Sequence, residues 1–409
     1  MNDGKAPALM IWALGLTQII GYGTLYYSFG ILAPDMAADL GVSKDVVFGI
    51  LSGALLIGGL IAPRAGRWAD RFGAGTLMVP GSIAAALALV AAALSPNIAF
   101  FTASLALMEI ASSFVLYSTA FTAIVQLGGS GAQRSITHLT LIAGFASSCF
   151  WPLTSALHVH VDWRGIYYMF AFLNIAVCLP IHWWVRSLFT RHGVRRSDQD
   201  GAEKPDGAAH DPAPPNAVFL AMLAAFALEG FVIAAVLVHM VPLLGAVGAG
   251  GAALFVSTLF GPSQVASRLL NMVFGGRLSQ TMLAVISAGL LSAGAAALLV
   301  SGNLLPGLGA FAIIFGLGSG LASIVGGTLP LELFGRRGYG ARLGWVSAAR
   351  QFSSALAPFL FALMMERWSA SGAVSAAAVI AAASLVCFGA IAAWRTRSRR
   401  LPRKQLVST

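Results

Sequence analysis

Long apolar runs dominate this chain and limit what it can fold into. The hydrocarbon core of a bilayer is crossed by about 20 apolar residues in a helix. In lipid, every backbone N–H and C=O must be paired within the chain, so runs of this length are expected to be helices. Twelve runs qualify: 9–33, 46–65, 76–94, 98–126, 135–157, 165–185, 217–241, 250–274, 281–301, 305–329, 343–365 and 373–394. The sequence therefore predicts an all-α membrane protein with twelve transmembrane helices.

Composition excludes a soluble protein. Hydrophobic residues make up 58% of the chain and charged residues only 10%, whereas a soluble domain carries about 25% charged residues. The three cysteines, Cys149, Cys178 and Cys387, lie in apolar runs and form no CxxC pair, so neither a disulfide framework nor a metal site is expected. No phosphate-binding loop of the G-x-x-x-x-G-K-[ST] type is present. The sequence predicts no cofactor and no enzyme.

The distribution of Lys and Arg predicts the orientation of the chain in the membrane. With the N-terminus inside, the cytoplasmic segments hold 20 Lys and Arg, the outer loops hold Lys44, Arg164 and Arg367, and Arg268 and Arg350 fall within spans. Cytoplasmic loops carry the excess of Lys and Arg, so both termini are expected in the cytoplasm. The same rule explains the formal charge of +10 without a nucleic-acid partner.

A polar segment divides the chain into two halves. Residues 186–216 are rich in charge, Gly, Ala and Pro, and such a segment cannot bury enough apolar surface to fold alone. We expect an N-terminal six-helix half over 1–185, a flexible cytoplasmic linker over 186–216, a C-terminal six-helix half over 217–394 and a basic cytoplasmic tail over 395–409. Transporters built from repeats have this organisation, with the substrate site between the repeats near the midplane.

A short charged turn after the second run carries a family resemblance. Gly66, Asp70, Arg71 and Gly73 match the G-x-x-x-D-R-x-G motif between helices 2 and 3 of the major facilitator superfamily. The position agrees with the family, although Ala74 and Gly75 stand where it usually has basic residues. Trp163-Arg164 at the start of the sixth run is also similar to the family. The resemblance implies secondary transport by alternating access and a monomer in the bacterial inner membrane.

The resemblance also assigns a gating role to this turn. Asp70 is a carboxylate expected at a helix end near the cytoplasmic surface. It can pair with the positive N-terminal end of a helix from the other half, for which helix 11 is the candidate. Such a contact would hold the cytoplasmic gate shut. The alternative is a solvated loop charge.

Two carboxyl groups are expected inside the membrane. Glu109 lies in the middle of the fourth run and Glu229 near the centre of the seventh. Charged groups at this depth are costly, so a carboxyl group kept there is a functional candidate. Each can bind and release a proton during a transport cycle, which predicts proton coupling. The alternative is a neutral Glu that makes one interhelical hydrogen bond.

Two arginines also fall within spans. Arg268 follows Gln264 in the eighth run, a segment similar to helix 8 of the monocarboxylate and oxalate transporter branch, where an arginine contacts the substrate carboxylate. Arginine stays charged and needs an anion, which predicts substrate contact, with Asn271 on the same face. A structural ion pair is the alternative. Arg350, in the eleventh run, is more simply explained by a side chain that reaches the cytoplasmic surface.

Helix 1 supplies further candidates for the lining of a cavity. Gln18, Tyr22 and Tyr26 are spaced by four residues, so they are expected to share one helix face. Three polar groups on one stripe suit contact with a substrate. Interhelical hydrogen bonding and an interfacial aromatic belt are the alternatives.

Together these features predict a proton-coupled secondary transporter of a small organic anion such as a monocarboxylate. Proton-driven export of a drug or of arsenite is the alternative, because related bacterial chains include such exporters. A ligand sensor with a transport fold is a second alternative, but such a protein would be expected to carry a soluble signalling domain.

Overall fold

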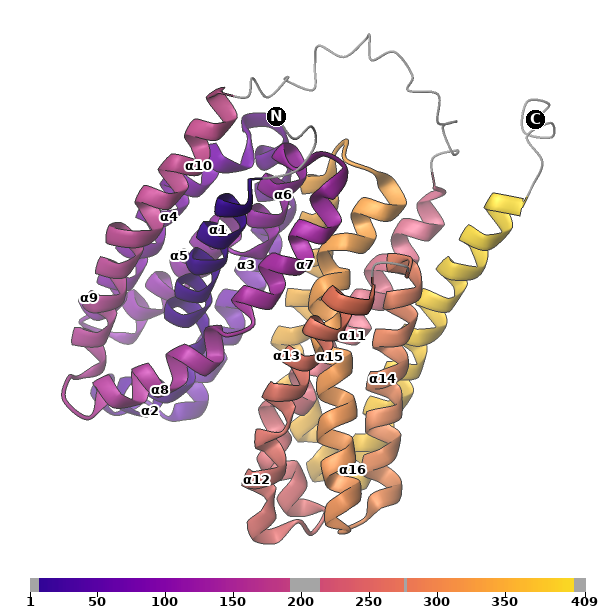
Figure 1. Ribbon diagram of the computed structural model, residues 1–409. Helices are drawn as coiled ribbons and strands as arrows, with labels where there is room; N and C mark the ends of the chain where they lie inside the picture. The colour runs from indigo at the N-terminus through magenta and orange to yellow at the C-terminus, as the bar shows by residue number, and fades with distance from the viewer. Residues whose placement is uncertain (1–6, 192–213, 276–277, 401–409) are drawn as a thin grey trace. The chain divides into compact units, whose positions relative to one another are not determined.

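The computed structural model describes residues 7–191, 214–275 and 278–400. The described chain is helical throughout (Figure 1). Most of the predicted linker, 192–213, and the end of the predicted tail, 401–409, lie outside the described residues.

The first ten α-helices come before the linker. They are α1 (Ala8–Tyr22), α2 (Phe29–Asp39), α3 (Lys44–Phe72), α4 (Ala74–Ala93), α5 (Ile98–Val115), α6 (Tyr117–Leu127), α7 (Ala132–Ala143), α8 (Ala146–His158), α9 (Trp163–Leu173) and α10 (Leu179–Arg191). The π-helical turns η1 (Gly23–Tyr27) and η3 (Asn174–Cys178) join α1 to α2 and α9 to α10. A 3-10 turn, η2 (Gly129–Gly131), precedes α7.

Six α-helices follow the linker. They are α11 (Asn216–Ala246), α12 (Ala253–Thr258), α13 (Phe260–Phe274), α14 (Gln280–Ser301), α15 (Leu305–Phe334) and α16 (Tyr339–Arg400), with the 3-10 turn η4 (Gly250–Ala252) before α12. The long α16 contains one non-helical residue, Ser369, with φ 75° and ψ 167°.

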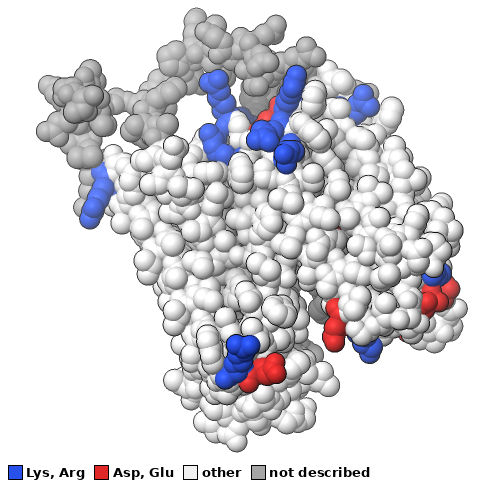
Figure 2. Space-filling view, turned by 180° about the vertical axis from the view of Figure 1, so that it is seen from behind, with Lys and Arg blue, Asp and Glu red and all other residues white. Residues whose placement is uncertain are grey.

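Ten helical segments of the described chain are long and apolar enough to cross a membrane. Two features separate this number from the twelve predicted spans. The predicted spans 343–365 and 373–394 fall within α16, and the predicted span 250–274 is divided among η4, α12 and α13. The charged side chains gather at the ends of the helices, and the surface between them is almost free of charge on the face in Figure 2. The chain is therefore a multi-pass membrane protein.

The described chain forms two compact units. We call Met1–Pro212 with Gly326–Leu356 the first unit, and Ala213–Val325 with Ala357–Thr409 the second. The chain passes from one unit to the other within α15 and again within α16. The first unit therefore includes the end of α15 and the start of α16, which the sequence assigned to the C-terminal half. That the two halves on either side of the linker are the parts that move in transport stays a prediction.

Small residues let the helices of the second unit approach closely. A Cβ built on Gly316 would lie 2.7 Å from the carbonyl oxygen of Phe260, and one built on Gly320 would lie 2.4 Å from that of Gln264. Both positions bring α15 against α13. A Cβ on Gly318 would meet the backbone nitrogen of Leu291 in α14 at 2.9 Å. Glycines on two faces of α15 thus permit the close van der Waals packing that holds helices together in lipid, where no hydrophobic driving force acts between them.

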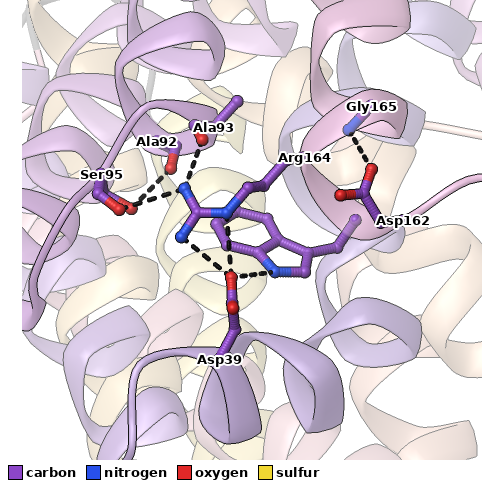
Figure 3. A network of polar contacts seen from close by, with 8 residues as sticks. Asp39, Ala92, Ala93, Ser95, Asp162, Arg164 and Gly165 are labelled. Carbon is purple, nitrogen blue, oxygen red and sulfur yellow. Dashed lines mark hydrogen bonds and ion pairs between the residues drawn. The ribbon is translucent and has the colours of Figure 1, made fainter.

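Arg164 connects three segments of the first unit near Asp39 (Figure 3). Its Nε donates to Asp39 Oδ2 over 2.9 Å, and its Nη1 donates to the carbonyl oxygens of Ala93, over 2.5 Å, and Ser95, over 3.0 Å. The indole Nε1 of Trp163 donates to the same Asp39 oxygen over 3.1 Å. The Trp-Arg pair therefore joins the ends of α2 and α4 to the start of α9.

Candidate functional site

The turn that carries the sequence motif caps the first turn of another helix. Asp70 lies in the last turn of α3, and Gly73, with φ 86°, leads into α4. Asp70 Oδ1 accepts a hydrogen bond from the backbone N–H of Gly340 over 2.8 Å, and Oδ2 accepts one from Ala341 over 2.8 Å. These N–H groups belong to the first turn of α16, where no helical carbonyl is available to them. Asp70 therefore meets the helix N-terminus that the sequence named as its candidate partner, and the contact lies within the first unit.

Glycines make this contact possible. A Cβ built on Gly66 would lie 2.0 Å from the carbonyl oxygen of Gly340, and one built on Gly344 would lie 2.4 Å from that of Ala62. Real Cβ atoms do not approach this closely, so any side chain at Gly66 would push α16 away from α3. We call the contact of Ala62, Gly66 and Asp70 with Gly340 and Gly344 the α3–α16 seam.

Arg71 is absent from these contacts. Its guanidinium lies over the ring of Phe72, 5.2 Å from the ring centroid, and the side chain is exposed. Arg342 lies on the α16 side of the turn instead, where its Nη1 donates to the carbonyl oxygens of Phe334, over 3.2 Å, and Arg337, over 2.6 Å. Arg342 therefore fixes the loop between α15 and α16.

Gln126 is a residue of this site that the sequence analysis missed. Its Oε1 accepts from the N–H of Ala74 over 3.0 Å, and its Nε2 donates to the carbonyl oxygen of Ala69 over 2.9 Å. The side chain thus joins the last turn of α3 to the first turn of α4 and holds the bend at Gly73. A glutamine near the end of an apolar run gave no signal of this role.

The predicted stripe on helix 1 is divided by a π-turn. Gln18 is fully buried, and its Nε2 donates to the carbonyl oxygen of Val115 over 2.8 Å. Tyr22, in contrast, packs against Tyr117 with ring centroids 4.7 Å apart. Tyr26 lies within η1 and is 45% exposed. The π-turn η1 widens the helical turn before Tyr26, and the role of Tyr22 and Tyr26 in lining a cavity stays a prediction.

The hydrogen bond of Gln18 compensates for a second irregularity, which the sequence did not predict. The fourth apolar run is not continuous, because extended Leu116 separates α5 from α6. The break deprives carbonyl groups of their helical partners, and unpaired backbone groups are costly in lipid. Gln18 bonds the carbonyl of Val115, and the hydroxyl of Thr119 donates to that of Ser113 over 2.8 Å. These side chains replace the lost helical bonds.

Glu109 and Arg350 are ionisable groups of the first unit without polar partners among the described residues. Glu109 lies on α5 and is 3% exposed, and its carboxyl group makes no hydrogen bond or ion pair with another described residue. Arg350 lies on α16, is half-buried and likewise makes neither. Its Nη1 lies 2.7 Å from the place of a Cβ on Gly326, so the guanidinium rests on a bare stretch of α15. The prediction that this side chain simply reaches the surface does not account for that packing.

Two tyrosines of the first apolar run lie near these groups, one near each. Tyr22 is within electrostatic range of Arg350, and Tyr26 is within range of Glu109. Both rings approach Tyr27, with centroid distances of 6.3 Å and 5.5 Å respectively. The three phenol rings therefore form one cluster in the first unit.

The second unit holds the other predicted carboxyl group. Glu229 is buried on α11, and the hydroxyl of Ser287 donates to its Oε1 over 2.8 Å. The same hydroxyl lies 2.9 Å from the carbonyl oxygen of Gly318. Glu229 is thus linked through α14 to the backbone of α15.

Arg268 is bonded to the same helix. Its Nη2 donates to the hydroxyl of Ser323 over 3.0 Å, and its Nε donates to the carbonyl oxygen of Gly320 over 3.5 Å. Gln264 reaches α15 as well, because its Nε2 donates to Ser319 Oγ over 2.7 Å. The structure therefore brings Arg268 and Gln264 together along α15.

Asn271 does not join them. Its Oδ1 lies 2.1 Å from the place of a Cβ on Gly275, at the end of α13. The side chain thus lies toward the C-terminus of its own helix, and the role of Asn271 in substrate contact beside Arg268 stays a prediction.

Comparison with solved structures identifies the fold. The human organic anion transporter MFSD10 (TETRAN) matches with a TM-score of 0.72 and 14% identity, over 94% of this chain and 100% of that one. The proton:xylose symporter XylE, bound to 6-bromo-6-deoxy-D-glucose, matches with a TM-score of 0.69 and 13% identity, over 93% and 95% of the two chains. The transporter FucP in its outward conformation gives a TM-score of 0.66 and 13% identity, over 93% and 98%.

Comparison with sequence families agrees with the fold. No curated protein matches the chain. The family model described as Major Facilitator Superfamily matches residues 14–304, which is more than half of the sequence. Its members and the matching structures are transporters, so the chain is not an enzyme. The sequence match and the shared fold establish that this multi-pass membrane protein belongs to the Major Facilitator Superfamily.

Proposed function

We propose that the protein is a proton-coupled secondary transporter of a small organic anion of the monocarboxylate type. It works by alternating access in the bacterial inner membrane, as a monomer with both termini in the cytoplasm. Counting α16 as two spans that meet at Ser369, and η4 to α13 as one, gives twelve spans in two halves. The fold accommodates this chemistry, because its solved examples include an organic anion transporter and a proton-coupled symporter.

The observation that carries the proposal is the guanidinium of Arg350. A guanidinium has five N–H donors in a fixed fork and keeps its charge. Within a membrane-spanning helix such a group is costly unless an anion or other acceptors meet it. None of the described residues supplies one to Arg350, and a carboxylate matches the fork with two parallel hydrogen bonds.

Other residues take supporting roles in this proposal. Tyr22 and Tyr26 border the anion, and Glu109 and Glu229 are the candidates for carrying the proton. Arg268 and Gln264 are candidate contacts in the second unit, where α15 already orients them. Gly66, Asp70 and Gly73 form the gate, because the α3–α16 seam must separate when this end of the transporter opens.

The test is transport by purified protein in liposomes that enclose a pH-sensitive dye. Lactate, pyruvate, a cationic drug and arsenite are added outside, for wild type, Arg350→Gln, Arg350→Lys and Arg268→Gln. We expect a carboxylate to acidify the interior and Arg350→Gln to reduce the rate about tenfold to a hundredfold, the loss of a charge-assisted hydrogen bond. Arg350→Lys should retain part of the activity. Arg367→Gln, at an exposed position, is the matched control.

Two results would contradict the proposal. If arsenite or the drug moved protons while the carboxylates did not, the protein would be an exporter. If Arg268→Gln abolished carboxylate transport while Arg350→Gln did not, the anion would be bound in the second unit.

A further inference from the structure

We propose that the transported anion is a monocarboxylate that carries an aryl ring. The ring packs against Tyr22, Tyr27 and their aromatic neighbours, and the carboxylate meets the guanidinium of Arg350. The inference rests on the proposed function and names the substrate class within it, because lactate and pyruvate have no aromatic ring.

Five aromatic side chains from three segments of the first unit contact one another. The ring centroid of Tyr27 in η1 lies 6.3 Å from that of Tyr22 and 5.5 Å from that of Tyr26. Trp151 of α8 lies 5.9 Å from the same ring, and Tyr117 of α6 lies 4.7 Å from Tyr22. Tilted and edge-on pairs at these distances attract each other. We call these five side chains the aromatic cluster.

The aromatic cluster keeps ring surface uncovered. Trp151 is 50% exposed and Tyr26 45%, and the other three rings are half-buried. By contrast, a chain of rings that belongs to the core of the same unit is buried, with each member at most 3% exposed: Phe101, Trp163 and Tyr167. Core packing therefore explains the second set of rings but leaves the open faces of the aromatic cluster without a described neighbour that covers them.

The aromatic cluster leads to the guanidinium of Arg350. The ring of Phe121 stacks on Tyr117, with centroids 4.9 Å apart and an angle of 14° between the planes. Phe121 Cδ2 lies 2.6 Å from the place of a Cβ on Gly327, and Arg350 Nη1 lies 2.7 Å from the place of one on Gly326. Two successive residues of α15 therefore contact the chain of rings and the guanidinium.

Irregular backbone places the rings. Tyr26 and Tyr27 belong to the π-turn η1, and Tyr117 is the first residue of α6, directly after the break at Leu116. Such departures from the helix recur at functional sites in membrane transporters. Tyr22 itself is within electrostatic range of Arg350.

The combination of open rings and a guanidinium selects the ligand. A lipid acyl chain would cover the rings but would leave the guanidinium without an anion. Lactate would match the guanidinium but would leave the rings uncovered. An aryl carboxylate supplies a flat ring for stacking and two oxygens for the guanidinium fork.

The experiment compares three 2-hydroxy acids in liposomes that contain the purified protein: lactate, mandelate, in which a phenyl group replaces the methyl group, and hexahydromandelate, in which that ring is saturated. Radiolabelled uptake is measured against protein-free liposomes. We expect half-saturation by mandelate at a concentration at least about tenfold below that of lactate, because the phenyl group is buried. Mandelate should also be preferred to hexahydromandelate about fivefold to a hundredfold, the effect of contact with two rings.

Ring variants test the assignment to the aromatic cluster. Tyr22→Leu and Tyr27→Leu should each lower the preference for mandelate over hexahydromandelate about two- to tenfold, whereas Tyr22→Phe should keep it. The preference is a ratio within one variant, so it does not depend on the amount of folded protein. Tyr168→Leu is the matched control, because Tyr168 of α9 is exposed and makes no ring contact with the described residues.

The outcomes separate this inference from the proposed function. If wild type moves none of the three acids, the proposed function fails. If lactate is moved but saturates transport at the same concentration as mandelate, or if hexahydromandelate equals mandelate, the function stands and the aromatic class is overturned. An unchanged preference in both Leu variants overturns the assignment to the aromatic cluster. If neither Leu variant transports, the wild-type preference decides for or against the aromatic class.

Discussion

At the scale of single residues, the difference between candidates lies in their hydrogen bonds. Asp70, Arg268 and Glu229 have partners within their own units. The side chains of Arg350 and Glu109 have no hydrogen-bonding or ionic partner among the described residues. A bonded ionisable group is explained by structure alone, whereas a charged group without partners in a membrane needs another reason to persist.

Replacement of Asp70 by Asn should weaken the α3–α16 seam. The amide nitrogen would face the N–H of Gly340 or Ala341, so one hydrogen bond would be lost and the helix N-terminus would lose its anion. We expect a cost of about 1–3 kcal/mol. A cysteine at Ala62, which is buried in the seam, should then react with a maleimide about five- to a hundredfold faster, in a background without native cysteines.

The exposed Arg67→Gln is the control for this measurement, because Arg67 lies on the same helix. Equal labelling rates in Asp70→Asn and in the unsubstituted reference would mean that the carboxylate does not hold the seam.

Gln126→Leu should destabilise the bend at Gly73. Leucine has a similar size but leaves the N–H of Ala74 without its partner, and the carbonyl of Ala69 keeps only the bond from the N–H of Gly73. We expect a loss of about 1–3 kcal/mol, measured as a lower midpoint temperature in detergent. Gln133→Leu is the control, since the Gln133 side chain makes no hydrogen bond with the described residues. An equal effect of the two substitutions would argue against a special role for Gln126.

At the scale of elements, irregular helices characterise the first unit. Helix 1 passes through η1, the fourth apolar run is broken at Leu116, and the sixth passes through η3. Asn174 of η3 donates to Thr24 of η1 over 3.1 Å, so the two π-turns are bonded to each other. π-turns and broken helices recur at functional sites, and the cluster of Tyr22 and Tyr117 adjoins two of these irregularities.

The glycines of α3 provide a test at this scale. Gly66→Ala places a Cβ against the backbone of Gly340, whereas Gly53→Ala meets no heavy atom within 4 Å. We expect Gly66→Ala to increase labelling at Ala62 and to lower the midpoint temperature. Gly53→Ala should be neutral or slightly stabilising, since alanine favours helix by about 0.5–1 kcal/mol. The seam would be refuted as a close contact if both variants behaved alike.

At the scale of the whole molecule, the proposed topology assigns each turn to one side of the membrane. The proposed twelve spans place the turns at Gly73, Gly128 and Gly335 on one side, and those at Gly41, Asn97 and Gly302 on the other. Single cysteines at these positions should divide accordingly when intact cells are labelled with an impermeant maleimide, with the second group labelled. Labelling of Gly73 and Gly41 positions from the same side would contradict the topology.

The sequence by itself determined that the chain is a helical membrane protein, because apolar runs of this length can pair their backbone groups in lipid only as helices. It also located the Asp70 turn, because the motif is local and its spacing is read directly. It did not show where the helices break, since Leu116 and Leu259 are apolar residues that resemble their neighbours in sequence.

Only the tertiary structure decided which polar groups are satisfied. Asp70 and Gly340 are 270 residues apart in sequence, and Gln18 and Val115 are 97 apart. No local sequence pattern therefore predicts these hydrogen bonds. The same holds for Arg350, which the sequence placed near the surface and which the structure packs against Gly326. Burial in lipid makes each unpaired donor costly, and its partners come from whichever helices the fold brings beside it.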